Sequence, residues 1–175
     1  MKIIKLLFFL LLLSCKTEKK IDKVKVEIIL EKTDTAFYFP FRNHKEIEFF
    51  KDYEKQRGSI IDDNIGLLIL KKGNQNYILL NKFIRKNNPL KYKILDTVNI
   101  GKIEKNQYLA IYNCFVNNKQ DKRLIALVED NYEENLNKPF IRDILKSWIV
   151  DTENYKININ KDIKSIKCEN EGYGL

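Results

Sequence analysis

Apolar and polar residues alternate through much of this chain, which is the pattern of strands that bury one face. The first such stretch, residues 24–30, predicts a strand. Two apolar runs, residues 66–70 and 77–84, flank the turn residues 72–74 and predict a β-hairpin, because glycine and asparagine favour tight turns. The second run would also fit a helix.

The same pattern predicts a meander of three successive strands at residues 92–98, 107–116 and 122–129. Asparagine or glycine in the connecting segments supplies the turn chemistry. Further strands are predicted at residues 36–41, where Pro40 marks an end or an edge, and at 148–151 and 155–160.

A first helix is predicted from Asn43 to Arg57. Asn43 and Glu46 have the spacing of an N-cap and its capping-box partner, and Gly58 fits the stop. The inner face of this helix would carry Ile47, Phe50 and Tyr53.

A second helix is predicted to begin at Asn137, with Pro139 in its first turn. Apolar residues then recur at helical spacing, namely Phe140, Ile141, Ile144, Leu145 and Trp148. Together these elements predict an α+β fold, with two helices packed on a mostly antiparallel sheet that contains the meander. A lipocalin-like β-barrel is the alternative.

The N-terminus has a different pattern. Basic residues precede the apolar segment 6–13, which is shorter than the about 20 residues of a membrane-spanning helix, and this is typical of a signal peptide. The segment ends in Leu12-Leu13-Ser14-Cys15, which resembles the lipobox of bacterial lipoproteins. The resemblance implies that Cys15 receives a diacylglycerol and that cleavage follows Ser14. A secretory signal with an incidental cysteine, or an anchoring helix, is the alternative.

This resemblance divides the chain into a signal peptide (1–14), a lipidated cysteine with a polar tether (15–23) and a single globular domain (24–175). The protein would attach to the membrane through the acyl chains on Cys15 and not through a membrane-spanning helix. Lys16, and not aspartate, follows the cysteine, which in the lipoprotein class implies release from the inner membrane. We therefore expect the protein to lie in the cell envelope of a Gram-negative bacterium, attached to either face of the outer membrane.

The charge of the chain changes this picture little. The formal net charge is +8, but lysines are dispersed among 24 acidic residues, so the composition does not favour nucleic acid as a partner. The densest basic stretch, residues 16–25, follows the anchor and would lie in the solvated tether or against lipid head groups.

Two cysteines remain when Cys15 is lipidated, and an oxidising compartment favours a disulfide between Cys114 and Cys168. A loop of this length gives about 4 kcal/mol of stabilisation in the chain-entropy account. The bond would pin the C-terminal tail to the strand that carries Cys114. Two unpaired thiols are the alternative.

Catalytic motifs are absent from the sequence. His44 is the single histidine, and its place near a predicted helix start favours an exposed imidazole. The adjacent carboxylates Asp62-Asp63 and Glu133-Glu134, and Glu169 with Glu171, match no glycosidase, phosphatase or calcium-loop pattern. We expect no cofactor, no metal and no enzymatic activity.

An aromatic run next to a cation is the best candidate for binding. Its residues are Phe37, Tyr38, Phe39, Phe41, Arg42 and His44. If these residues form a strand, half of the rings would be exposed, as on carbohydrate- and peptide-binding faces. Packing of the rings in the core is the competing interpretation, because one side of the strand must be buried.

The leading functional interpretation is a lipid-anchored, non-enzymatic envelope protein that binds a partner protein or a cell-surface component. An immunity or inhibitor lipoprotein is the alternative, followed by an envelope hydrolase that uses carboxylates. The C-terminal residues 146–175 resemble the tails of uncharacterised small exported lipoproteins, and that resemblance implies no activity.

Overall fold

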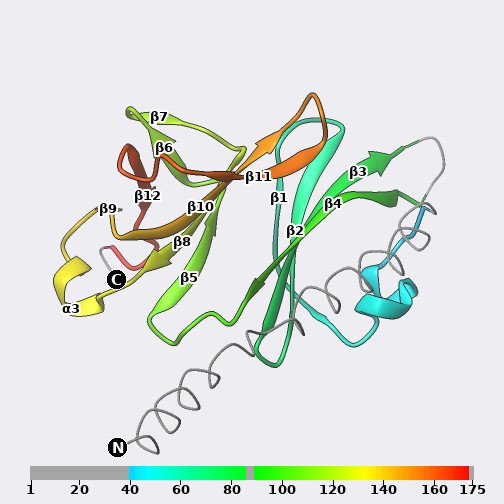
Figure 1. Cartoon of the computed structure of the whole chain (residues 1–175), viewed down its shortest axis with the longest axis horizontal. Coiled ribbons are helices and arrows are strands. Elements are labelled where there is room, and N and C mark those ends of the chain that lie inside the picture. The colour runs from blue at the N-terminus through cyan, green and yellow to red at the C-terminus, as the bar shows by residue number, and fades with distance from the viewer. Residues whose placement is uncertain (1–39, 86–88, 174–175) are drawn as a thin grey trace, which may run out of the picture. The chain divides into compact units, whose positions relative to one another are not determined.

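The computed structural model describes residues 40–85 and 89–173, which form a nearly all-β structure of three four-stranded antiparallel sheets (Figure 1). In spatial order, sheet A contains β1 (Glu54–Ile60), β2 (Ile65–Lys72), β3 (Gln75–Ile84) and β4 (Lys91–Gly101). Sheet B contains β11 (Lys156–Asn160), β10 (Ile144–Asp151), β8 (Leu124–Glu129) and β5 (Gln107–Ile111). Sheet C contains β7 (Lys119–Gln120), β6 (Cys114–Val116), β12 (Ile166–Glu169) and β9 (Phe140–Ile141).

Helical structure in the described ranges is limited to short pieces. They are the 3₁₀ turns η1 (His44–Glu46) and η2 (Glu48–Phe50) and the single α-helical turn α3 (Tyr132–Asn135). The predicted α+β fold is therefore wrong. The lipocalin-like alternative is wrong as well, because the strands form three separate sheets and no closed barrel.

The hairpin predicted around Gly73 is confirmed. β2 and β3 pair from Ile65 with Lys82 to Lys72 with Gln75. Gly73 has a φ of +55°, a conformation that glycine adopts without the steric cost of a Cβ atom, and it occupies the first position of a two-residue turn. The helical alternative for residues 77–84 is excluded, because they lie in β3.

Sheet B lies between the other two sheets because its central strand β8 is apolar on both faces. Ile125 and Leu127 point toward sheet A, whereas the alternate residues Leu124, Ala126 and Val128 point toward sheet C. The core between sheets A and B contains Ile65, Leu67, Ile69, Ile78, Leu80, Leu109, Ile111, Trp148 and Val150. Among the described strands, none forms a second sheet on the opposite face of sheet A, here called the outer face.

The lower half of the outer face is covered by the chain that precedes β1. Phe50 and Tyr53 from this segment pack on Leu70, Tyr77 and Leu79 of sheet A. Aromatic contacts fix the arrangement, with ring centroids 5.5 Å apart for Phe50 and Tyr77 and 5.6 Å apart for Tyr53 and Tyr77. The described residues leave the upper half of the same face, where Gly66 and Asn81 lie, open.

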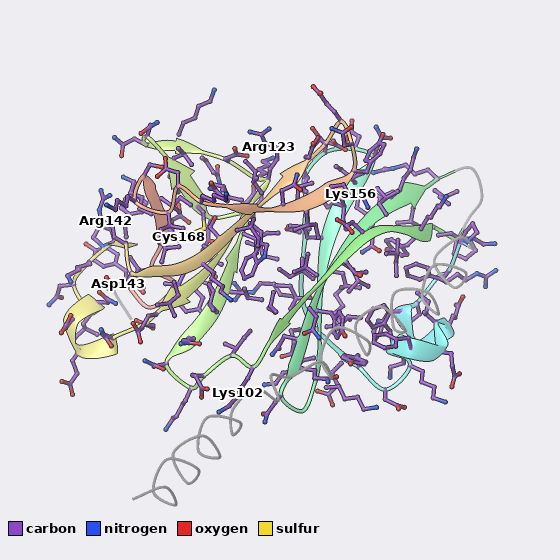
Figure 2. All side chains as sticks on the ribbon, in the orientation of Figure 1. Lys102, Arg123, Arg142, Asp143, Lys156 and Cys168 are labelled. Atoms are coloured by element: carbon purple, nitrogen blue, oxygen red, sulfur yellow. A yellow bond between two sulfur atoms is a disulfide. The ribbon has the colours of Figure 1, made fainter. Side chains whose placement is uncertain are left out.

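A disulfide joins Cys114 and Cys168, which are directly opposite each other in β6 and β12 and fully buried. It holds the C-terminal strand to β6, as the cysteine count led us to expect. Figure 2 labels Cys168 of β12 and Lys156 of β11 together with four charged residues in the connections between strands, namely Lys102, Arg123, Arg142 and Asp143.

The first predicted helix is replaced by the two 3₁₀ turns and β1. Asn43 does cap η1, because its side chain accepts a hydrogen bond from the Lys45 amide. Ile47 then adopts an extended conformation that ends the turn, and from Glu54 the backbone pairs with β2. The apolar positions assigned to the inner face, Ile47, Phe50 and Tyr53, are nevertheless buried.

The second predicted helix is also wrong, because its apolar residues belong to β9 and β10. A β-bulge between Ile144 and Lys146 inserts one residue into β10 and changes which face the following side chains occupy. The resulting spacing of Ile144 and Trp148 imitates a helical period, although Trp148 faces sheet A and Ile144 faces sheet C.

The predicted meander 92–129 is only partly correct. Its three stretches do form strands, but β4 pairs with β3 and β5 pairs with β8. The second stretch breaks at Tyr112, whose φ is +79°, so that β5 and β6 belong to different sheets. The strands predicted at 148–151 and 155–160 are confirmed as the β10–β11 hairpin.

Several predictions fall outside the described ranges. They are the signal peptide 1–14, Cys15 and the tether 15–23, the strand at 24–30, and most of the stretch 36–41. Among the residues that the structure does describe, no helix has the length and apolar character needed to cross a membrane.

Candidate functional site

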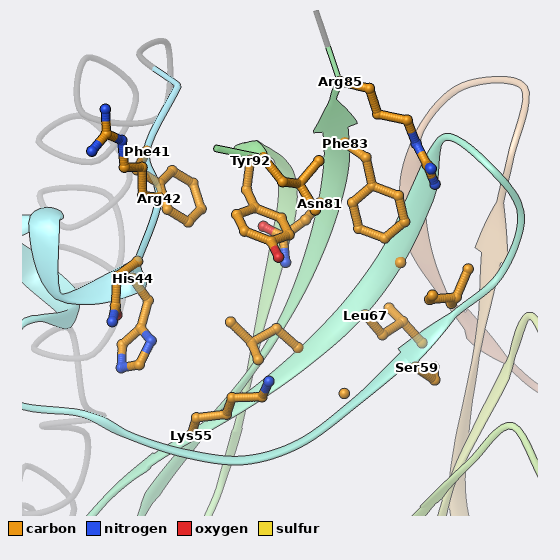
Figure 3. Close-up of a pocket in the computed structure, with 16 residues that line it drawn as sticks. Phe41, Arg42, His44, Lys55, Ser59, Leu67, Asn81, Phe83, Arg85 and Tyr92 are labelled. Carbon is orange, nitrogen blue, oxygen red and sulfur yellow. The ribbon is translucent and has the colours of Figure 1, made fainter. Parts of the chain in front are cut away.

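The open upper half of the outer face forms a hollow with a volume of about 760 Å³, here called the outer-face hollow (Figure 3). Its floor is sheet A, and residues 41–44 form one wall. The hollow exists because no segment in the described ranges covers the alternate residues of β2 and β3 that point away from sheet B at this level. Its volume lies within the range of about 300–1,000 Å³ that is usual for small-molecule sites.

Asn81 is the polar residue of the floor. It continues the outward-facing row of β3 after Tyr77 and Leu79, and its side chain is only 4% exposed. Its carbonyl oxygen Oδ1 is buried and has no hydrogen-bond partner among the described residues. A buried amide of this kind costs about 1–3 kcal/mol unless a ligand or water completes its hydrogen bonds.

Three aromatic rings form the apolar wall of the hollow. The ring centroids of Phe41 and Tyr92 lie 5.9 Å apart, and those of Phe83 and Tyr92 also lie 5.9 Å apart. Phe41 is held to β4 by two backbone hydrogen bonds with Tyr92, of 2.8 and 2.7 Å, so this part of the wall is fixed to the sheet. Leu68 adds an aliphatic surface on the floor.

Gly66 allows Phe83 to lie close to the floor. A Cβ atom at this position would come within 2.7 Å of the Phe83 ring and within 2.6 Å of the Ser59 carbonyl oxygen. A larger residue would therefore displace the ring or separate β1 from β2. The shape of the hollow depends on the missing side chain.

The charged side chains that line the hollow are all positive. Arg42, Lys55 and Arg85 line it, and none of its described lining residues is an aspartate or a glutamate. Figure 3 shows the Lys55 ammonium pointing toward the centre, with Asn81 and Tyr92 opposite and the two arginines on opposite sides. Arg85 is engaged, since its Nη2 donates to the Asp63 carbonyl at 2.9 Å. Lys55 forms no ion pair with any residue in the described ranges.

His44 lies in the wall, but the prediction that its imidazole is exposed is wrong. The residue is 7% exposed, and Nε2 donates a hydrogen bond to the Tyr53 carbonyl oxygen at 2.8 Å. Nε2 must carry the proton, because a carbonyl oxygen only accepts. This bond ties η1 to the start of β1 and gives His44 a positioning role in the wall.

The predicted binding run is only partly described. Phe41, Arg42 and His44 all line the outer-face hollow, whereas Phe37, Tyr38 and Phe39 lie outside the described ranges. Sequence reasoning did not find the residues that sheet A contributes, which are Lys55, Asn81, Phe83 and Tyr92. The signal for Asn81 was an amide in the outward row of an otherwise apolar strand.

Two of the carboxylates noted in the sequence, Asp62 and Glu171, have local structural roles. Asp62 accepts hydrogen bonds from the backbone of Asn64 and Ile65 in the β1–β2 turn. Glu171 pairs with Arg57 of β1, with Oε2 2.8 Å from Nη2, and this contact lowers the pKa of Glu171. No group of three histidine, cysteine or carboxylate side chains in the described part of the chain converges as a metal site would require.

Another buried polar atom lies on β5 of sheet B. The Tyr108 hydroxyl has no hydrogen-bond partner within the described ranges. Burial, followed by the negative charges of Asp130 and Glu171, raises the pKa of Tyr108 to about 12. The phenol therefore stays protonated at neutral pH, and none of the described residues places a base within hydrogen-bonding distance of it.

We compared the chain with known proteins. No protein-family model, curated protein or solved structure matches the chain. The fold and the site together define a class by physical features alone, a layered antiparallel β-domain with a cationic, aromatic-lined hollow on one sheet.

Proposed function

We propose that this protein is a non-enzymatic binding protein of the bacterial cell envelope and that the outer-face hollow is its ligand site. The observation that carries the proposal is the Asn81 side-chain oxygen Oδ1, which is buried at the floor of a hollow of ligand size and has no hydrogen-bond partner in the described ranges. A buried polar atom of this kind calls for a partner, and the hollow gives a ligand or water access to it.

The chemistry of the lining supports binding and not catalysis. General acid–base catalysis needs a titratable pair near the substrate, and the described lining residues offer no carboxylate. The one imidazole uses Nε2 to hold the Tyr53 backbone. Lys55 and the aromatic wall are groups that hold and orient a molecule.

The envelope location rests on the sequence. Leu12-Leu13-Ser14-Cys15 supports lipid attachment at Cys15, and the disulfide between Cys114 and Cys168 is compatible with an oxidising compartment. A Cys15→Ser variant should move to the soluble fraction and lose labelling with a palmitate analogue. Unchanged membrane association of this variant would contradict the anchor.

Native mass spectrometry of the mature chain tests the ligand site. The protein is incubated with an extract of bacterial envelopes, and non-covalent adducts are recorded. We expect an adduct that is at least about tenfold weaker in Asn81→Leu, because a lost hydrogen bond to a charged group costs about 1.5–3 kcal/mol.

A matched control is Ser147→Ala. Ser147 in β10 is 1% exposed and also has an unpartnered side-chain oxygen in the described ranges, but it lies outside the hollow. This variant should keep the adduct. Absence of any adduct, or one that Asn81→Leu leaves unchanged, would contradict the proposed site.

A further inference from the structure

We infer that the ligand of the outer-face hollow is an amphipathic anion, with a flat apolar body against the aromatic wall and its negative group at Lys55. This inference rests on the proposed function and adds the chemical class of the ligand. It follows from the sign of the charges, the direction of the polar groups and the composition of the wall.

The charges select the sign of the ligand. All three fully charged lining residues are cations, and the described lining contains no carboxylate that could neutralise them. A positively charged ligand would meet repulsion from each side of the hollow. An anion would instead gain a charge-assisted hydrogen bond, which is roughly twice as strong as a neutral one.

Lys55 is the cation best placed to bind this anion. It lies on β1 next to Gly58, where a Cβ atom would come within 3.8 Å of the Lys55 Cε atom, so the lysine stem crosses open floor. Figure 3 shows its ammonium directed to the centre of the hollow, facing Asn81 and Tyr92. The Lys55 ammonium and the Tyr92 hydroxyl are donors that can converge on one negative group, whereas the unpartnered Oδ1 of Asn81 is an acceptor and would take a hydrogen bond from an N–H or O–H group of the ligand or from a water.

The aromatic wall indicates the chemistry of the apolar body of the ligand. The rings of Phe41, Tyr92 and Phe83 form a continuous surface, and Leu68 adds an aliphatic contact on the floor. Offset or edge contacts with such rings favour a flat aromatic body. A carboxylate, a sulfonate or a phosphate would satisfy the polar end equally, since each is an anionic oxygen acceptor.

Two fluorescent probes with the same aromatic body test the inference. 1-Anilinonaphthalene-8-sulfonate is the anionic probe, and N-phenyl-1-naphthylamine is the same ring system without the sulfonate. Both are titrated into the mature chain that carries Cys15→Ser. Lys55→Met should weaken binding of the anionic probe about tenfold and change the affinity for the neutral probe less than about twofold, because a charge-assisted hydrogen bond is lost from one probe only.

Substitutions at two further positions, Lys146 and Leu68, test whether the probes bind in the outer-face hollow. Lys146→Met removes an exposed lysine from β10, far in sequence from the hollow, and should leave both affinities unchanged. Leu68→Trp fills the floor and should abolish binding of both probes. Leu68→Phe adds less volume and serves the same purpose if the tryptophan variant does not fold.

The outcomes separate the inference from the proposed function. If Leu68→Trp or Leu68→Phe removes both probes but Lys55→Met lowers their affinities equally or not at all, the hollow binds ligands and the anionic class is wrong. If neither probe binds, or if filling the floor has no effect, the ligand site itself is wrong.

Discussion

Replacement of Asn81 by leucine should stabilise the ligand-free protein, which is the reverse of what most core substitutions do. The asparagine is 4% exposed, and its Oδ1 has no partner in the described ranges. Leucine has nearly the same shape, so the change creates no cavity and removes an unsatisfied acceptor that costs about 1–3 kcal/mol. We expect a gain of about 1–2 kcal/mol in the free energy of unfolding.

The same strand contains a matched control for this change. Asn76 is 3% exposed, but its Nδ2 donates to the Gly101 carbonyl oxygen at 2.8 Å. Asn76→Leu breaks that bond and leaves a carbonyl unpaired, so it should destabilise the protein by about 1–2 kcal/mol. Two asparagines of equal burial in β3 should therefore give effects of opposite sign.

Urea unfolding followed by the fluorescence of Trp148 measures both changes, since Trp148 is the single tryptophan and is buried. In thermal unfolding of a domain of this size, each kcal/mol of change in the free energy of unfolding corresponds to about 2–4 °C in Tm. Asn81→Leu should raise Tm and Asn76→Leu should lower it. A loss of more than about 1 kcal/mol for Asn81→Leu would refute the reasoning, because it would show that the amide is already paired.

Substitutions test three other features of the fold: the disulfide, the β2–β3 turn and the pairing of Glu171 with Arg57. Replacing both Cys114 and Cys168 with alanine should cost about 2–4 kcal/mol in urea unfolding, and an unchanged midpoint would argue against the disulfide. Gly73→Ala should cost about 1 kcal/mol because of the positive φ, whereas Gly73→Asn should cost less, and equal effects in thermal unfolding would contradict the turn. Since the pKa of Glu171 is lowered in the folded state, its pairing with Arg57 stabilises the protein above the ordinary value of 4.5 and is lost as the pH falls through the folded pKa. Glu171→Gln should therefore cost less than about 1 kcal/mol at pH 7 and nothing at strongly acid pH, and a pH-independent difference would contradict this account.

Local chemistry explains what could be predicted from the sequence. The β2–β3 hairpin depends on two apolar runs and a glycine at positive φ, all within about twenty neighbouring residues. The Cys114–Cys168 pair follows from counting cysteines. The burial of Phe50 and Tyr53 follows from their apolar spacing, whatever the backbone between them does.

Long-range pairing explains most of what could not be predicted. Residues 54–60 form a strand because β2 offers a free edge, and nothing in their own polar sequence indicates that partner. Residues 140–148 fit a helical spacing because a bulge shifts the side chains of β10 from one face to the other. In both cases tertiary contacts override a weak local preference.

The site was difficult to predict for a related reason. The aromatic run around Phe41 was recognisable, but its partners Lys55, Asn81 and Tyr92 come from three strands that meet only in the folded sheet. His44 was expected to be exposed because its acceptor, the Tyr53 carbonyl, lies nine residues away and becomes available only when the chain turns into β1. The hollow itself depends on which half of the outer face is covered.

The position of a bound ligand tests the central claim most directly. Side-chain amide resonances of asparagines in the mature chain can be followed by NMR while 1-anilinonaphthalene-8-sulfonate is added. The account predicts that the Asn81 amide shifts in proportion to occupancy while the Asn76 amide stays in place. A saturable titration that moves neither amide, or only that of Asn76, would contradict it.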